Sequence, residues 1–188
     1  MHELEPHYNW RNLYIASEDE NSPFFGRQYS EFEFTHTIYN HFIHPQWDDI
    51  GSPTLFIKIL YVNYEESCCI IELMGEWNDT LNNDVMHLKR NVIDEMIPEG
   101  INKFVLIGEN VLIFHGSDDC YYEEWSEELE DGFIALVNFH PHVLEDMQSF
   151  GIQYFLQIQE NLHDINWRTF NPNSLVSYVE SLMTRKLT

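Results

Sequence analysis

The sequence predicts a protein of mixed α/β (α+β) class, with a single mixed sheet and helices packed on that sheet. Several segments show the two-residue alternation or the continuous hydrophobicity of strands. In the second half of the chain, such segments alternate with amphipathic helical patterns. The chain also has 188 residues, 44% of them hydrophobic, which suffices for one domain with its own core. Antiparallel N-terminal strands followed by βα crossovers are therefore expected.

The N-terminal half predicts an irregular segment and then three strands. Residues 1–27 mix aromatic side chains with a polar run, as is typical of a segment held on the surface of a domain. Alternation over residues 29–39 predicts a half-buried strand whose inner side carries Phe32, Phe34, His36 and Ile38. The apolar stretches 54–64 and 68–77 are joined by a short polar link, so we expect them to form an antiparallel hairpin.

The C-terminal half alternates helices and strands. Apolar residues at helical spacing from Leu81 to Met96 predict the clearest helix, and Pro98 ends it. A buried strand is expected at 103–107, with 111–114 either continuing it or pairing beside it. The remaining predicted elements are a helix from Ser117, a strand at 133–139, a helix from Pro141, a strand at 152–158, a loop at 161–170 and a closing helix at 171–187. The predicted single domain thus has an irregular segment 1–27, a sheet core 28–160 and the closing helix.

The charge balance restricts the partners of the chain. The sequence has 9 Lys and Arg against 32 Asp and Glu, a formal net charge of −23. Nucleic acids and anionic membranes bind cationic surfaces, so neither is expected as the main partner. The apolar runs are too short for a membrane span, and residues 1–6 do not resemble a secretory signal. Three cysteines, two of them adjacent, predict reduced thiols in a soluble cytoplasmic protein.

An acidic block from Asp118 to Asp131 is the most conspicuous local feature. On a helix, Tyr121, Trp125 and Leu129 would face inward, and most of the carboxylates would face water. A solvated helix face is the simplest interpretation. A more specific interpretation is a surface that docks a basic protein, with four candidate residues: Glu123, Glu124, Glu127 and Glu128. A divalent-cation site is a third, although the spacing of a calcium loop is missing.

The turn before this block combines a histidine, a hydroxyl and two carboxylates. It follows a strand and opens a helix, so it is a candidate regulatory or reactive turn, made by His115, Ser117, Asp118 and Asp119. A nucleophilic Ser117 would need His115 as its base, and the flanking glycines of a nucleophile elbow are absent. Helix capping by Ser117 or Asp118 explains the turn equally well. We therefore predict no catalytic residue.

Histidines gather at two further places. The first group lies just before Asp48 and Asp49, but its spacings match no zinc motif, so we predict no metal site there; the residues concerned are His36, His41 and His44. His140 and His142 flank a strand-to-helix turn, where parallel sheets place ligands and where helix capping is also expected. Because no glycine-rich phosphate loop or dinucleotide motif occurs, no cofactor is predicted.

The order of strands and helices from Thr54 to Ile158 resembles the STAS fold of anti-sigma-factor antagonists, a family of small bacterial regulatory domains. The stretch Val111-Leu112-Ile113-Phe114-His115-Gly116-Ser117-Asp118 is similar to the strand and serine turn of that family. The resemblance places Ser117 at the serine that a partner kinase phosphorylates there. The family has Asp-Ser-Ser-Gly at this turn, however, and a phosphate beside Asp118 and Asp119 would be repelled. The resemblance therefore implies the fold and a bacterial origin, and it does not extend to the phosphoswitch.

These observations lead to a function hypothesis and its alternatives. A non-catalytic regulatory or protein-binding module is the leading one, because no catalytic motif is assembled and the surface is acidic. A small enzyme or metal-dependent binder is the competing one, with a His/Asp/Ser site at the carboxyl ends of the strands. A homodimer is the third, because the chain has 5 Trp, 10 Tyr and 13 Phe, and interfaces are enriched in aromatic residues.

Overall fold

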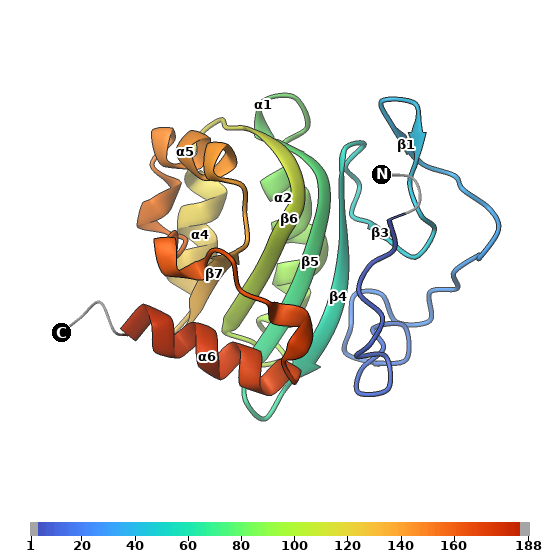
Figure 1. Cartoon of the computed structure of the whole chain (residues 1–188), viewed down its shortest axis with the longest axis horizontal. Helices are drawn as coiled ribbons and strands as arrows, with labels where there is room; N and C mark the ends of the chain where they lie inside the picture. The colour runs from blue at the N-terminus through green and yellow to red at the C-terminus, as the bar shows by residue number, and fades with distance from the viewer. Residues whose placement is uncertain (1–3, 185–188) are drawn as a thin grey trace.

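The computed structural model describes residues 4–184, and its centre is a five-stranded mixed sheet (Figure 1). The strand order is β3-β4-β5-β6-β7, and a separate pair, β1-β2, lies outside this sheet. The strands are β1 (Thr37–Ile38), β2 (His41–Phe42), β3 (Asp48–Asp49), β4 (Leu55–Asn63), β5 (Cys68–Asn78), β6 (Lys103–His115) and β7 (Phe133–Val137).

The helical segments begin after β5 and alternate with the last two strands along the chain. The helical segments are α1 (Asp79–Asn82), α2 (Asp84–Leu88), the π-helical turn η1 (Lys89–Ile93), α3 (Asp94–Met96), α4 (Cys120–Glu128), α5 (Pro141–Ser149) and α6 (Pro172–Thr184). Three short 3-10 turns lie between α5 and α6: η2 (Ile152–Tyr154), η3 (Glu160–Leu162) and η4 (Trp167–Thr169). The predicted closing helix is confirmed as far as Thr184; its expected last residues, 185–187, lie outside the described part.

The pairing of the strands confirms the predicted α/β class. β4 and β5 form the expected antiparallel hairpin, and β3 pairs antiparallel with β4. β5, β6 and β7 are mutually parallel, because helical crossovers connect them. The two apolar stretches at 103–107 and 111–114 are one continuous strand, β6.

The two faces of the sheet are covered by different elements. One face packs against α2, η1, α4 and α5, with Ile71, Leu106 and Leu136 among its sheet residues. The opposite face carries residues such as Ile70 and Val105, and it packs against α6 and Trp10 of the N-terminal segment. Figure 1 shows α6 crossing this second face and α2 lying behind the sheet. Alternating side chains of the same strands thus serve two apolar cores.

Two of the predicted strands are wrong. Of residues 29–39, only Thr37 and Ile38 pair as a strand, and Phe32 is 87% exposed. The rest of the segment joins no strand of the five-stranded sheet, where the two-residue strand β3 pairs with β4. The segment 152–158 makes one bridge, from Gln157 to Ala135, and its first residues form a 3-10 turn.

The predicted helix from Leu81 to Met96 is interrupted. Asn83 has left-handed backbone angles, φ 53° and ψ 51°, which end α1 and restart the chain as α2. Asparagine tolerates this conformation better than most residues. As a result Leu81, expected on the inner face, is 80% exposed.

Candidate functional site

Helix α4 carries the acidic block and is anchored by two large side chains. Tyr122 and Trp125 are fully buried, and Trp125 packs edge-on against Phe104 of β6 at 5.4 Å between ring centroids. Tyr122 donates a hydrogen bond to buried Asp79 at 2.5 Å. The expected inward stripe needs correction, because fully buried Tyr122 takes the place of partly buried Tyr121. The helix begins at Cys120 and its N-cap residue is Asp119, but the Asp118 carboxylate accepts a hydrogen bond from the Cys120 backbone N–H at 3.4 Å.

The four glutamates expected to form a docking face fall into two pairs. Glu124 accepts two hydrogen bonds from the Arg90 guanidinium, at 2.6 and 2.8 Å. Glu128 accepts one from Lys89 at 2.6 Å. Glu123 and Glu127 are exposed, and neither has a cation within ion-pair distance among the described residues. Half of the predicted face is therefore neutralised within the chain.

Lys89 is the centre of this internal neutralisation. Its side chain is 0% exposed, and it contacts Asp94 as well as Glu128. Burial alone would lower the pKa of Lys89, but hydrogen bonds to the two carboxylates outweigh burial and raise this pKa. The bidentate contact with Arg90 lowers the pKa of Glu124. Both glutamates thus hold α4 against η1.

The carboxylates on the outer side of the block are not paired with cations in the described part of the chain. Within residues 4–184, none of its other six carboxylates has a Lys, Arg or His within ion-pair distance. We call this set the α4 edge; it comprises Asp118, Asp119, Glu123, Glu127, Glu130 and Asp131, all exposed. Cys120 lies beside it and donates a hydrogen bond from Sγ to Asp118 at 2.7 Å, which raises the pKa of this thiol. A reactive thiolate is accordingly disfavoured there.

The turn between β6 and α4 does not assemble a nucleophile. His115 points to Glu76 of β5, with 3.7 Å between Nε2 and Oε1. No hydrogen bond joins Ser117 to His115 in the described part of the chain, and Ser117, Asp118 and Asp119 are all exposed. The backbone carbonyl of Gly116 accepts a hydrogen bond from Thr80, which ties the turn to α1.

The histidines do not converge on one point. His36 contacts Asp49 at 3.1 Å, whereas His44 contacts Glu5 at 3.2 Å. His41 lies on the exposed strand β2. Between residues 4 and 184, no three His, Cys, Asp or Glu side chains are arranged to hold a metal ion.

The histidines that flank Pro141 are engaged by the backbone of β6. His140 and His142 stack on each other at 5.6 Å, and they donate hydrogen bonds to the backbone carbonyls of Glu109 and Leu112. His140 is also the N-cap residue of α5, but no side-chain hydrogen bond caps the helix. These contacts give both rings a structural role at the start of α5.

Sequence reasoning missed a buried ionic cluster at the sheet edge. Asp48 of β3 is 0% exposed and accepts a 2.5 Å hydrogen bond from Tyr29. Lys58 and Arg27 lie 3.5 and 3.4 Å from its two oxygens. Burial raises the pKa of Asp48 and lowers that of Lys58. The signal was Lys58 itself, a single cation within the apolar run of β4.

Three further expectations concern the cysteines, membrane spans and self-association. The three cysteines are free. In the described part of the chain, no helix has both the length and the apolar composition to cross a bilayer. Several aromatic side chains on and beside the β1–β2 pair are exposed, namely Phe32, Phe34, Tyr39 and Phe42. Self-association through them stays a prediction.

Comparison with known proteins gives weak matches only. No protein-family model matches the sequence, and no match was found among the curated proteins. Among the solved structures that match, two cover 56% of this chain. One is the anti-sigma factor antagonist SpoIIAA in its unphosphorylated form, with 15% identity, a TM-score of 0.41 and 90% of that chain covered. The other is the Bacillus cell fate determinant SpoIIAA in the phosphorylated form, with 14% identity, a TM-score of 0.37 and 93% covered. The weak resemblance to anti-sigma-factor antagonists predicted from the sequence is thereby confirmed.

Proposed function

We propose that this protein is a non-catalytic protein-binding module of regulatory type, and that a basic protein docks on its α4 edge. The observation that carries the proposal is the division of the acidic block. Glu124 and Glu128 are used to fix the helix, whereas the α4 edge has no Lys, Arg or His of residues 4–184 within ion-pair distance. Such a surface attracts a cationic partner and favours that partner over acidic competitors.

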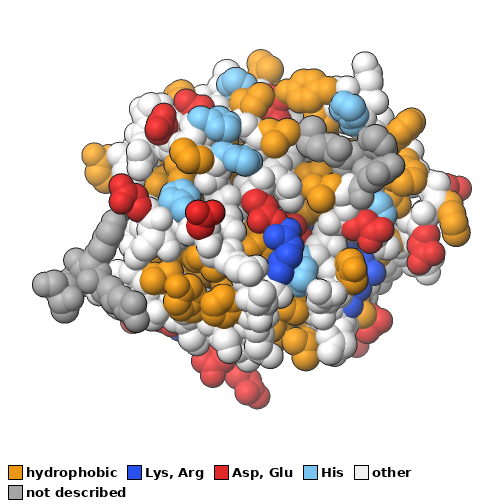
Figure 2. Space-filling model, viewed as in Figure 1, with side chains coloured by type: hydrophobic (Ala, Val, Ile, Leu, Met, Phe, Trp, Pro, Cys, Tyr) orange, Lys and Arg blue, Asp and Glu red, His pale blue; other side chains and the backbone are white. Residues whose placement is uncertain are grey.

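The position of the α4 edge suits rigid docking. Tyr122 and Trp125 fix the helix from below, and the ion pairs with Lys89 and Arg90 fix it from the side. A surface held in this way loses little conformational freedom when a partner binds. On the face drawn in Figure 2, Asp and Glu are spread widely, and Lys and Arg occupy only small areas near the middle. Long-range repulsion should therefore exclude nucleic acids and acidic proteins.

The test is a comparison of two neutralised variants in partner capture. Glu123→Gln with Glu127→Gln removes two charges from the α4 edge. Glu145→Gln with Asp146→Asn removes two exposed charges from α5 and is the matched control. The proposal predicts a basic protein captured at low salt by the wild type and the control, with about tenfold less captured by the α4 variant. Equal capture by the two variants would contradict docking at this edge.

The competing hypothesis of a small enzyme or metal-dependent binder gains no support from the geometry. His115 faces Glu76, the side chains of His140 and His142 contact backbone carbonyls, and Ser117 is exposed.

A further inference from the structure

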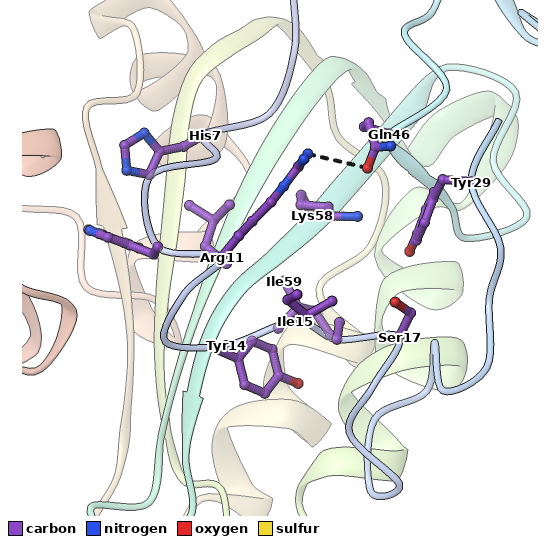
Figure 3. Close-up of a pocket in the computed structure, with 12 residues that line it drawn as sticks. His7, Arg11, Tyr14, Ile15, Ser17, Tyr29, Gln46, Lys58 and Ile59 are labelled. Atoms are coloured by element: carbon purple, nitrogen blue, oxygen red, sulfur yellow. Dashed lines mark hydrogen bonds between the residues drawn. The ribbon is translucent and has the colours of Figure 1, made fainter. Parts of the chain in front are cut away.

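A cavity of about 150 Å³ lies between the N-terminal segment and strand β4 (Figure 3). Its apolar walls come from Trp10 and Ile15 on the segment and from Ile59 and Leu60 on the strand. The segment is fixed over the sheet by Trp10, which packs against Trp167 at 5.6 Å and donates a hydrogen bond to the Phe170 carbonyl. The cavity is therefore bounded by anchored residues on both sides.

The polar end of this cavity is cationic. Figure 3 shows Arg11 and Lys58 extending toward Gln46 and Tyr29, with the Ser17 hydroxyl directed to the same region. The lining contains no Asp or Glu from the described residues, in a chain that has 32 of them. Such an exclusion of carboxylates from one pocket contrasts with the rest of this acidic chain.

The two cations at this end are incompletely neutralised. Lys58 shares its one carboxylate, Asp48, with Arg27. The Arg11 guanidinium has the Gln46 amide oxygen at 3.3 Å and no carboxylate within ion-pair distance in the described part. Burial has the largest effect on the pKa of Lys58 and lowers it. The nearby charges also act on this pKa, which Asp48 raises and Arg11 lowers. An anion placed between Arg11 and Lys58 would relieve their mutual repulsion.

We propose that this cavity binds a small organic carboxylate, with its charged group between Arg11 and Lys58 and its apolar body between Ile15 and Ile59. The size supports a body of about one ring, because an engineered cavity of about 150 Å³ in another protein accommodates benzene. A guanidinium and an ammonium together provide the charge-assisted donors that a carboxylate requires. Ser17 and Gln46 can complete the contacts to its oxygens. The site is independent of the α4 edge, which lies on a different element.

The test is calorimetric titration of the full chain with two carboxylates and their neutral amides. The probes are benzoate with benzamide, and 4-methylpentanoate with 4-methylpentanamide. We expect at least one carboxylate to saturate a single site and to bind at least about tenfold more tightly than its amide, because the amide lacks the charge-assisted hydrogen bonds.

Three variants test the assignment of the cation. Arg11→Gln should weaken carboxylate binding about tenfold or more, whereas Arg11→Lys should retain most of it. Arg168→Gln is the matched control, because Arg168 is an exposed arginine paired with Glu109 outside the cavity. If neither carboxylate binds more tightly than its amide, or if Arg11→Gln and Arg168→Gln behave alike, the proposed site is overturned.

Discussion

Replacing Asp79 with alanine is expected to lower the free energy of unfolding by about 4 kcal/mol. The Asp79 carboxylate is buried and accepts hydrogen bonds from Tyr122, from the Trp77 indole and from the Val85 backbone, at 2.5, 3.0 and 2.8 Å. Alanine leaves these three buried donors without their acceptor. The loss is partly offset, because burial raises the pKa of Asp79 to about 6 and the carboxylate is therefore costly to keep charged. Urea denaturation at neutral pH measures the effect.

Asp119→Ala is the control for this prediction. Asp119 is exposed, and its side chain caps no backbone group, so the change should stay within about 0.5 kcal/mol. The loss of unfolding free energy for Asp79→Asn should fall between the losses for Asp79→Ala and Asp119→Ala. The amide oxygen of asparagine still accepts a hydrogen bond, while its NH₂ group faces donors. A loss below about 1 kcal/mol for Asp79→Ala would contradict the view that this carboxylate organises the site. Its bond to Tyr122 helps to fix α4, the helix that carries part of the proposed docking surface.

Glu72→Gln should stabilise the protein by ~3 kcal/mol above pH 7 and have little effect below pH 4.5. Glu72 of β5 is 1% exposed, and burial raises its pKa from the ordinary 4.5 to about 7. Between these two values, the folded chain keeps a proton that the unfolded chain releases. The free energy of unfolding of the wild type therefore decreases as the pH rises through this range. Glutamine mimics the protonated form and removes this contribution.

The measurement is a series of urea denaturations from pH 4 to pH 8 for the wild type and the variant. Asp79 also titrates with a raised pKa, but it is present in both proteins and cancels from their difference. The free energy of unfolding of the variant minus that of the wild type should rise from near zero and reach a plateau above pH 7. Glutamine keeps an oxygen to accept the bond from the His7 backbone N–H. A difference that does not change with pH would show that Glu72 carries no buried charge at neutral pH.

The sequence predicted the parts of the fold whose patterns are local and strong. The hairpin β4–β5, the strands β6 and β7 and the helices α5 and α6 all follow from apolar spacing and turn residues. The segment 29–39 had an equally clear alternation, but a strand also needs a neighbouring edge, and the pattern contains no information on that. The break at Asn83 depends on a single residue in a left-handed conformation.

The candidate site was predictable only in part. The acidic block was evident, but Lys89 and Arg90 lie more than thirty residues before Glu124 and Glu128, and only the packing of η1 on α4 shows that they are partners. The cavity beside Lys58 combines the N-terminal segment with β4, which no spacing rule connects. A lysine inside an apolar strand was the one local sign of it.

Zero-length carbodiimide cross-linking of the captured complex tests docking at the α4 edge most directly. The reagent joins a carboxylate to an amine of the partner as an amide, so the linked residues lie at the interface. Mass spectrometry should find partner lysines joined to carboxylates of the α4 edge, namely Asp118, Asp119, Glu123, Glu127, Glu130 or Asp131. Links confined to other surfaces, such as Glu145 and Asp146 of α5, would contradict the proposed function.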